Sequence, residues 1–210
     1  MNRIFLLINL LLMFLVISFN SCIIVKYDNK EEIEFEPEID ISPKPTIELS
    51  NTMIRSSKGD MIAFLPKDWF LINVENQFSN DIIAVAVNKE YNMSVVFSTI
   101  RVEPEFQNKI EEEGLFGLAW YAYNKREKKS AGNIKQIGKY QGIKMGVRKF
   151  VKYEFALKNE AITSKSVVFI STTNDYYEFS LVPMSINGNL LPKTQEINDI
   201  FNSILTGIKF

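Results

Sequence analysis

The sequence predicts an α+β fold in which an antiparallel β-sheet is covered by amphipathic helices. Three observations support this prediction. Strand-like apolar segments come first, a long helical segment and a second set of strands follow, and a helix closes the chain. The consecutive strands are separated by short turns, which join antiparallel neighbours. Each of the two helices has one apolar side that must be buried against another layer.

The N-terminus is typical of an exported protein. Met-Asn-Arg precedes an apolar run from Ile4 to Phe19, and the only cysteine, Cys22, follows Ser21. A charged start, an apolar stretch and a small residue at the cut site predict a signal peptide over residues 1–21. The cysteine after the small residue resembles the lipobox of bacterial lipoproteins. This resemblance implies that Cys22 carries a lipid (diacylglyceryl and palmitate chains) and anchors the protein to a membrane of the cell envelope.

Two other interpretations of this segment stay open. Phe19 stands where a lipobox usually has Leu, and Asn20 replaces a small residue. The run from Ile4 to Val25 is about long enough to span a bilayer as an uncleaved anchor. Ordinary secretion with an incidental cysteine is the third possibility. All three predict export or membrane attachment, and none specifies the inner or outer membrane.

Residues 22–52 are expected to be a lipidated, acidic tether. Residues 26–50 contain eight acidic residues against three lysines, and Pro37, Pro43 and Pro45 disfavour a helix. Such a composition is typical of an extended spacer, although it could also fold back on the basic segment described below. A single domain is then predicted over residues 53–210.

The first strands of this domain follow from apolar and β-branched runs. We expect strands at Asp60–Leu65, Phe70–Asn73, Asp81–Val87 and Met93–Val102. The third run is almost entirely apolar, which indicates a central, buried strand. Pro66 ends the first strand because proline cannot donate a ladder hydrogen bond.

A helix is predicted from Pro104 to about Lys125, because proline is well tolerated in the first turn of a helix. Its apolar side is formed by Phe106, Ile110, Leu118 and Tyr121. A meander of strands comes next, at Ile134–Tyr140, Lys144–Leu157, Ile162–Ser171 and Tyr176–Val182. The last helix begins at about Lys193, with Ile197, Ile200, Phe201, Ile204, Leu205 and Ile208 at amphipathic spacing.

The opening of the domain resembles the PsbP-like superfamily. Residues Gly59–Trp69 contain a strand followed by Pro66-x-x-Trp69, and the strand with Tyr177–Phe179 and a closing helix near Phe210 are also similar. The resemblance implies an α/β/α sandwich. The superfamily includes an accessory subunit of photosynthetic oxygen evolution, a nuclear transport factor and bacterial lipoproteins, so it also implies a non-catalytic binding or accessory role.

Composition argues against several chemistries. The chain has no histidine and one cysteine, which excludes Ser-His or Cys-His nucleophile pairs and His- or Cys-rich metal sites. The nine glycines lie apart, so a phosphate-binding loop is absent. The formal charge of −1 gives no global field for nucleic acid. We therefore expect no catalytic residues, metal, cofactor or nucleic-acid partner.

Two candidate sites remain. Between Lys125 and Lys165 there are twelve basic and three acidic residues, and the segment opens with Lys125, Arg126, Lys128 and Lys129. These four predict a site for an anion or a partner protein of the envelope, or else solvated cations in a Lys-rich chain. The second candidate is an aromatic groove formed by Trp120, Tyr121 and Tyr123. Because these residues lie on different sides of one helix, they cannot all face the core of the domain.

The sequence thus favours a membrane-anchored envelope lipoprotein whose domain is a non-catalytic binding or accessory module. The alternative is a carrier for a small apolar molecule or lipid, held in a cavity between helix and sheet. A histidine-free enzyme is the third hypothesis.

Overall fold

The computed structural model describes residues 32–73, 79–159, 162–184 and 190–210. The predicted signal peptide and Cys22 lie outside these residues. The chain from Ile33 to Phe210 forms one compact unit. Its strands are β1 (Phe35–Asp40), β2 (Leu49–Arg55), β3 (Ile62–Pro66), β4 (Phe70–Ile72), β5 (Ile82–Val87), β6 (Met93–Thr99), β7 (Ile134–Met145), β8 (Arg148–Leu157), β9 (Thr163–Ile170) and β10 (Tyr176–Pro183).

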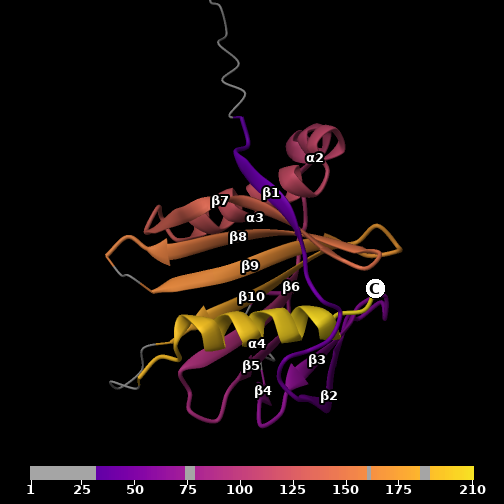
Figure 1. The fold of residues 1–210 in the computed structure, drawn as a ribbon. Helices are drawn as coiled ribbons and strands as arrows, with labels where there is room; N and C mark the ends of the chain where they lie inside the picture. Colours follow the sequence, from indigo (N-terminus) through magenta and orange to yellow (C-terminus); the bar gives the residue numbers. More distant parts are fainter. Residues whose placement is uncertain (1–31, 74–78, 160–161, 185–189) are drawn as a thin grey trace, which may run out of the picture. The chain divides into compact units, whose positions relative to one another are not determined.

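Eight of these strands form one large sheet in the order β1-β7-β8-β9-β10-β6-β5-β4 (Figure 1), and β2 pairs with β3 in a second sheet. All neighbours in the large sheet are antiparallel except β1, which runs parallel to β7. The predicted mixed α+β class is confirmed. The sheet is more extensive than the antiparallel sheet that the sequence predicted.

Part of the predicted tether belongs to the domain. β1 lies within the acidic segment and extends the large sheet beside β7, and β2 also begins before residue 53. An ion pair supports this arrangement, with Nζ of Lys139 on β7 lying 2.9 Å from Oε2 of Glu34. The boundary expected at residue 53 therefore moves to Ile33.

The strand predicted over Lys144–Leu157 is two strands joined by a turn at Gly146-Val147. Gly146 has φ of 61°, a conformation that glycine adopts without strain. Val147 is 98% exposed at the tip of this hairpin. An apolar residue in the turn continues the alternating pattern, which is why the sequence indicated one uninterrupted strand.

The helical elements are η1 (Pro104–Phe106), α2 (Gln107–Glu113), α3 (Leu115–Lys129) and α4 (Thr194–Gly207). The single helix predicted from Pro104 to Lys125 is interrupted at Gly114, whose φ of 60° and ψ of −134° are not helical. Gly117 lies close to the preceding helix, because a Cβ there would be 2.7 Å from the Lys109 carbonyl oxygen. The interruption lets α2 turn back on α3.

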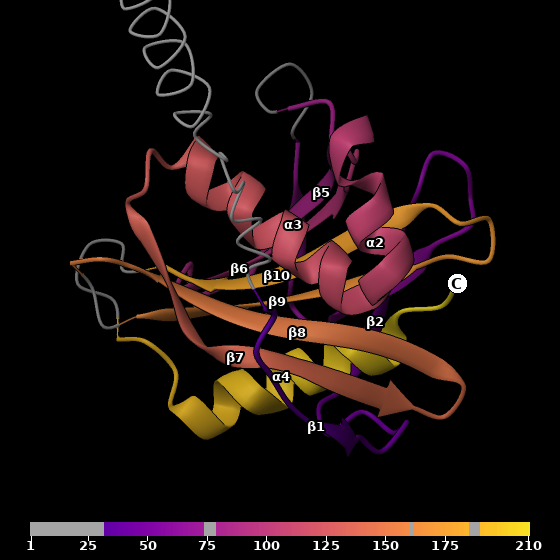
Figure 2. The same ribbon diagram turned by 90° about the horizontal axis from the view of Figure 1, so that it is seen from above.

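The large sheet has a hydrophobic core on each face. Side chains alternate along β8, so Phe150 lies in the core with α4 while Val151 and Tyr153 lie in the core with α3. Figure 2 shows α3 and α4 on opposite sides of the sheet. The Pro66-x-x-Trp69 segment forms a turn on the α4 side, where Trp69 is buried and its backbone N–H donates to the Pro66 carbonyl over 3.3 Å.

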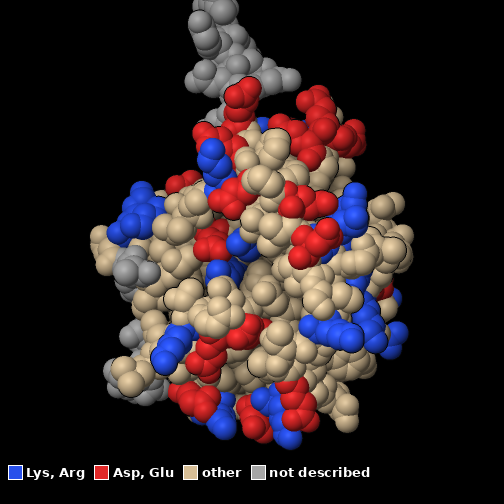
Figure 3. Space-filling model, in the orientation of Figure 1, with Lys and Arg blue, Asp and Glu red and all other residues tan. Residues whose placement is uncertain are grey.

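Charge is unevenly distributed over the surface. Figure 3 shows acidic side chains gathered over α2 and the start of β1, whereas both signs are mixed over the rest of that view. Within the described ranges, no helix combines the length and hydropathy that crossing a bilayer requires.

Candidate ligand pocket beside helix α3

A pocket of about 390 Å³ opens where the C-terminal half of α3 overhangs the sheet. α3 packs on β7, β8 and β9, and the pocket continues from the edge of the helix onto β5, β6 and β10. Its helical wall is formed by Ala122, Lys125, Arg126, Lys129 and Ser130. Its other walls are formed by Ser79, Asp81, Ile82, Val96, Ser98, Thr99, Ile100 and Glu178. A volume of this size is in the range of small-molecule sites.

Small side chains on the strands leave this space open. The face of the sheet that points toward α3 carries five serines on β6, β9 and β10, namely Ser94, Ser98, Ser164, Ser166 and Ser180. Ser98 lies directly opposite Glu178, and Ser180 opposite Ser166, in the strand register. Of these serines, Ser98 lines the pocket, and a larger β-branched residue at this position would fill part of the volume beside the helix.

A buried ion pair lies at the floor of the pocket. Nη2 of Arg126 donates to Oε1 of Glu178 over 2.7 Å and to Oγ of Ser180 over 3.0 Å. The hydroxyl of Tyr153 donates to the same Glu178 oxygen. Glu178 is 7% exposed and Tyr153 is fully buried. A carboxylate this deeply buried is tolerated because a cation and hydrogen-bond donors compensate for its lost hydration.

Arg126 and Tyr153 keep one protonation state at neutral pH. Burial alone would lower the pKa of Arg126, but the charge of Glu178 outweighs it and the pKa is raised. Burial, followed by the negative charge of Glu178, raises the pKa of the Tyr153 hydroxyl above its usual value. Arg126 therefore stays charged and Tyr153 stays a neutral donor. Nε of Arg126 is buried and lacks a hydrogen-bond partner among the described residues.

Two lysines and a second ion pair surround the pocket mouth. Nζ of Lys125 donates to the Arg101 carbonyl over 2.9 Å and lies 5.6 Å from the ring centre of Tyr121. The side chain of Arg101 pairs with Asp81 over 3.0 Å. Lys129 lies one turn after Lys125 on the same side of α3 and is exposed.

The structure separates the four predicted basic residues. Lys125, Arg126 and Lys129 line the pocket, but Arg126 is held in the ion pair of its floor. Lys128 lines a smaller hollow of about 110 Å³ on the outer side of α3. Later cations of the basic segment have other contacts: Lys139 pairs with Glu34, Arg148 donates to the Thr206 and Ile208 carbonyls, and Lys152 and Lys165 both contact Glu154.

The three predicted aromatic residues do not share one groove. Trp120 and Tyr121 line the smaller hollow together with Phe106. Tyr121 is anchored there, since its hydroxyl donates to the Arg101 carbonyl over 2.9 Å. Tyr123 faces the sheet instead and meets Tyr153 edge-on, with ring centres 6.0 Å apart.

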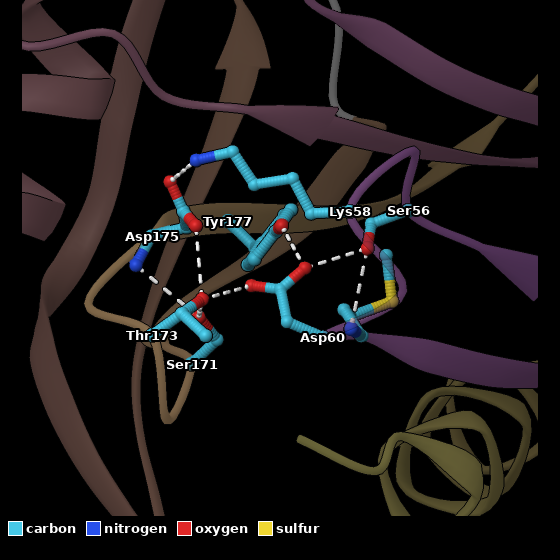
Figure 4. Close-up of polar contacts among 8 residues, drawn as sticks. Ser56, Lys58, Asp60, Ser171, Thr173, Asp175 and Tyr177 are labelled. Atoms are coloured by element: carbon cyan, nitrogen blue, oxygen red, sulfur yellow. Dashed lines mark hydrogen bonds and ion pairs between the residues drawn. The ribbon is translucent and has the colours of Figure 1, made fainter.

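A second polar cluster surrounds Asp60, just before β3 (Figure 4). The hydroxyls of Ser56 and Tyr177 each donate to Oδ1 over 2.6 Å, and that of Thr173 donates to Oδ2 over 2.7 Å. Nearby, Nζ of Lys58 lies 2.6 Å from Asp175. The cluster thus joins the start of β3 to the turn between β9 and β10.

The electrostatics of this cluster are those of a structural carboxylate. Burial would raise the pKa of Asp60, but hydrogen bonds from Ser171, Ser56, Tyr177 and Thr173 outweigh burial and lower it well below its usual range. Burial, together with the hydrogen bond to Asp60, raises the pKa of Tyr177 to about 12. Asp60 is therefore a stable acceptor at all pH values near neutrality, and the described residues contain no group of His, Cys, Asp and Glu arranged to hold a metal ion.

Sequence reasoning did not identify Glu178, Tyr153, Ser98 or Asp60 as site residues. One signal was present for the first of them. Glu178 is the one charged residue of the predicted strand Tyr176–Val182, and a carboxylate in a largely apolar strand predicts a buried cationic partner. The partner itself lies 52 residues earlier in the chain, so local pattern could not identify it.

Comparisons with known proteins support the fold. No family model matches the chain, and no curated protein matches its sequence. Twelve chains of solved structures match in fold. Cyanobacterial PsbP (CyanoP) from Synechocystis sp. PCC 6803 superposes with a TM-score of 0.55 and 10% identity, over 75% of this chain and 90% of that one.

A second similar structure is the Ran-binding protein Mog1p of Saccharomyces cerevisiae, with a TM-score of 0.47 and 12% identity, over 77% of this chain and 95% of that one. A third is a protein of Bacteroides thetaiotaomicron, with a TM-score of 0.36 and 13% identity, over 75% of this chain and 47% of that one. The likeness to PsbP at 10% identity establishes a PsbP-like fold alone.

Proposed function

We propose that this protein is a membrane-anchored envelope lipoprotein whose PsbP-like domain is a non-catalytic binding or accessory module, with the pocket beside α3 as its ligand site. One observation carries the proposal. The pocket of about 390 Å³ combines apolar walls with a floor of two fixed polar groups, Arg126 and Glu178, and the buried hydroxyl of Tyr153 donates to Glu178 from behind. Apolar walls with a few well-placed polar groups are typical of ligand sites.

Binding is favoured over catalysis by the chemistry of the floor. A general acid or base works best with a pKa near the working pH. The pKa values of Arg126 on the pocket lining and of Tyr153 behind Glu178 are both shifted upward, away from neutrality. These groups therefore hold a fixed pattern of charge and hydrogen bonds, which serves recognition rather than proton transfer.

The apolar-carrier hypothesis has less support. A cavity does lie between helix and sheet, as that hypothesis requires, but its floor contains an ion pair and its mouth contains two lysines. A purely apolar molecule would displace water from the two lysines without offering their charges a partner, which is costly.

The binding proposal can be tested by filling the pocket. Ser98 lies on the pocket wall and is half-buried, so Ser98→Phe should occupy the space without removing a core side chain. Protein extracted from membranes in mild detergent should carry a small molecule, detected by mass spectrometry after denaturation. That molecule should be absent from Ser98→Phe and retained in Ser42→Phe, a matched change at an exposed site. Equal recovery from wild type and Ser98→Phe would contradict the proposal.

The anchor is tested separately. Cells fed a clickable fatty acid should label the wild-type protein, and Cys22→Ala should lose the label because the chain contains no other cysteine. Equal labelling of both proteins would end the lipoprotein proposal. An uncleaved anchor would instead leave Cys22→Ala in the membrane fraction without label.

A further inference from the structure

We infer that the ligand of the pocket is a small amphipathic anion, with its charged group between Lys125 and Lys129 and its apolar body against Ile82, Val96 and Ile100. The inference rests on the proposed function, since it assigns a ligand class to the same pocket. It follows from two properties of the pocket, its uncompensated positive charge and its apolar wall, and the dipole of α3 opposes the charge too weakly to cancel it.

The charges of the pocket do not cancel. Glu178 is neutralised by Arg126 over 2.7 Å, and Asp81 by Arg101 over 3.0 Å. After these two pairs are formed, two full positive charges remain on the lining. Lys125 donates only to a neutral carbonyl, and Lys129 has no ion-pair partner in the described part of the chain. The unmatched charge at the mouth is therefore positive, and it attracts an anion.

The C-terminal end of α3 opposes this charge only weakly. A helix carries about half a negative charge at its C-terminus. The carbonyls of the last turn are also occupied, because the N–H groups of Ser130 and Gly132 bond to the carbonyls of Arg126 and Glu127. The two positive charges of the lysines therefore exceed the partial negative charge at this end of the helix.

The opposite wall suits an apolar group. Ile82, Val96 and Ile100 come from β5, β6 and the residue after β6, so they belong to the sheet side of the lining, whereas Lys129 belongs to α3. Covering such a wall contributes roughly 25 cal/mol per Å² of apolar surface removed from water. A ligand with both a negative group and an apolar body therefore matches the pocket better than an inorganic anion or a neutral hydrocarbon does.

The test uses four probes that share an unbranched eight-carbon skeleton and differ in the head group: octanoate, octyl phosphate, 1-octanol and octylammonium. Each is titrated into the purified wild-type domain at low ionic strength, and binding is measured by calorimetry and saturation-transfer NMR. We expect at least one anionic probe to bind at least about tenfold more tightly than octanol and octylammonium. The relative affinity of octanoate and octyl phosphate distinguishes a carboxylate from a phosphate ligand.

Substitution of the two lysines at the pocket mouth tests where the anion binds. Lys125→Met plus Lys129→Met should reduce the affinity for the preferred anion to that of octanol, about a tenfold loss, with little effect on octanol binding. Lys128→Met is the matched control, because Lys128 lies on the same helix but outside the pocket. It should bind all four probes as wild type does, and circular dichroism should show the same fold for every variant.

The outcomes separate this inference from the proposed function. Octanol or octylammonium binding as tightly as both anions would overturn the anion inference and retain the pocket as a ligand site. Unchanged anion affinity in the double lysine variant would also overturn it. Failure of all four probes would overturn the amphipathic-anion class, and the comparison of wild type with Ser98→Phe would then decide independently whether the pocket binds any ligand.

Discussion

The two helix-covered faces of the large sheet solve the packing problem in different ways. Under α4 the strands present large apolar side chains, and the Phe201 ring stacks on Phe179 with centres 5.4 Å apart. Beside α3 the same strands present serines and Glu178, and a pocket remains between helix and sheet. The apolar face supplies stability by burial. The polar face gives up part of that burial and keeps a defined arrangement of charges.

The largest effect on the free energy of unfolding is expected from a cavity opened under α4. Phe201 is buried in the α4 core, so Phe201→Ala should lower the free energy of unfolding by about 3–5 kcal/mol. Urea unfolding followed by circular dichroism measures the change. A loss below about 1 kcal/mol would show that the α4 face is not the main source of stability.

Removing one partner of the ion pair on the α3 face should lower the free energy of unfolding by a smaller amount. Glu178→Gln leaves the Arg126 charge without a counter-ion, and breaking a fully buried pair costs about 3–5 kcal/mol. The Arg126 side chain is 31% exposed, so we expect a loss of about 2 kcal/mol in urea unfolding.

A double variant sharpens this second prediction. Arg126→Met plus Glu178→Met removes both charges, and apolar replacement of buried pairs is often neutral. The double variant should therefore be more stable than Glu178→Gln. If it is less stable, the pair contributes more through packing and hydrogen bonds than through compensation of charge.

A carboxylate, Asp60, lies at the border of the α4 face, and it predicts that the free energy of unfolding depends on pH. Asp60→Asn should cost about 1 kcal/mol at pH 7, since it weakens hydrogen bonds to a charged acceptor. The folded pKa of Asp60 lies below the unfolded value of about 3.9. The contribution of Asp60 is therefore complete above the unfolded pKa and is lost as the pH falls through the folded pKa.

Urea unfolding of both proteins between pH 7 and pH 2 measures this effect. The stability difference between wild type and Asp60→Asn should be constant from pH 7 to about pH 5 and shrink below about pH 4. A constant difference down to pH 2 would contradict the role of the charged form.

The smallest effect is expected on the outer surface of α3. Lys128 is exposed and lies outside the pocket, so Lys128→Glu should change the free energy of unfolding by no more than about 0.5 kcal/mol. Thermal unfolding is a sufficient measurement. A change above about 1 kcal/mol would indicate a contact of Lys128 that the geometry of α3 does not explain.

Much of the fold could be predicted because its elements bury one regular stripe of apolar residues. α4 is the clearest case, since Ile200, Phe201, Ile204 and Leu205 are all buried at the predicted spacing. β1 could not be found in this way. Phe35 and Ile39 alternate with the acidic residues of FEPEID, but Pro37 and the acidic composition indicated a spacer, and all six residues are exposed. Backbone pairing with β7 defines this segment as a strand.

The pocket was less predictable than the fold. The basic residues at 125, 126 and 129 were identified from their density, but their separation into a buried partner and two rim charges depends on how far α3 extends over the sheet. That extent is set by Gly114, where the helical segment turns, and by strand pairings that bring Glu178 to Arg126. Contacts between residues so far apart in the chain leave no local pattern.

If the protein is anchored through Cys22, the incorporation of β1 into the sheet would also limit how far the domain can lie from the membrane. If Cys22 bears the lipid, only ten residues, 23–32, separate it from Ile33, where the compact unit begins. Ten residues span at most roughly 35 Å when fully extended, close to the roughly 30 Å thickness of a bilayer's hydrocarbon core. A spacer reaching residue 52 would have allowed roughly 100 Å. With that attachment, the shorter connection would keep the domain in the water layer next to the lipid headgroups. The domain would then encounter any partner or ligand in this layer.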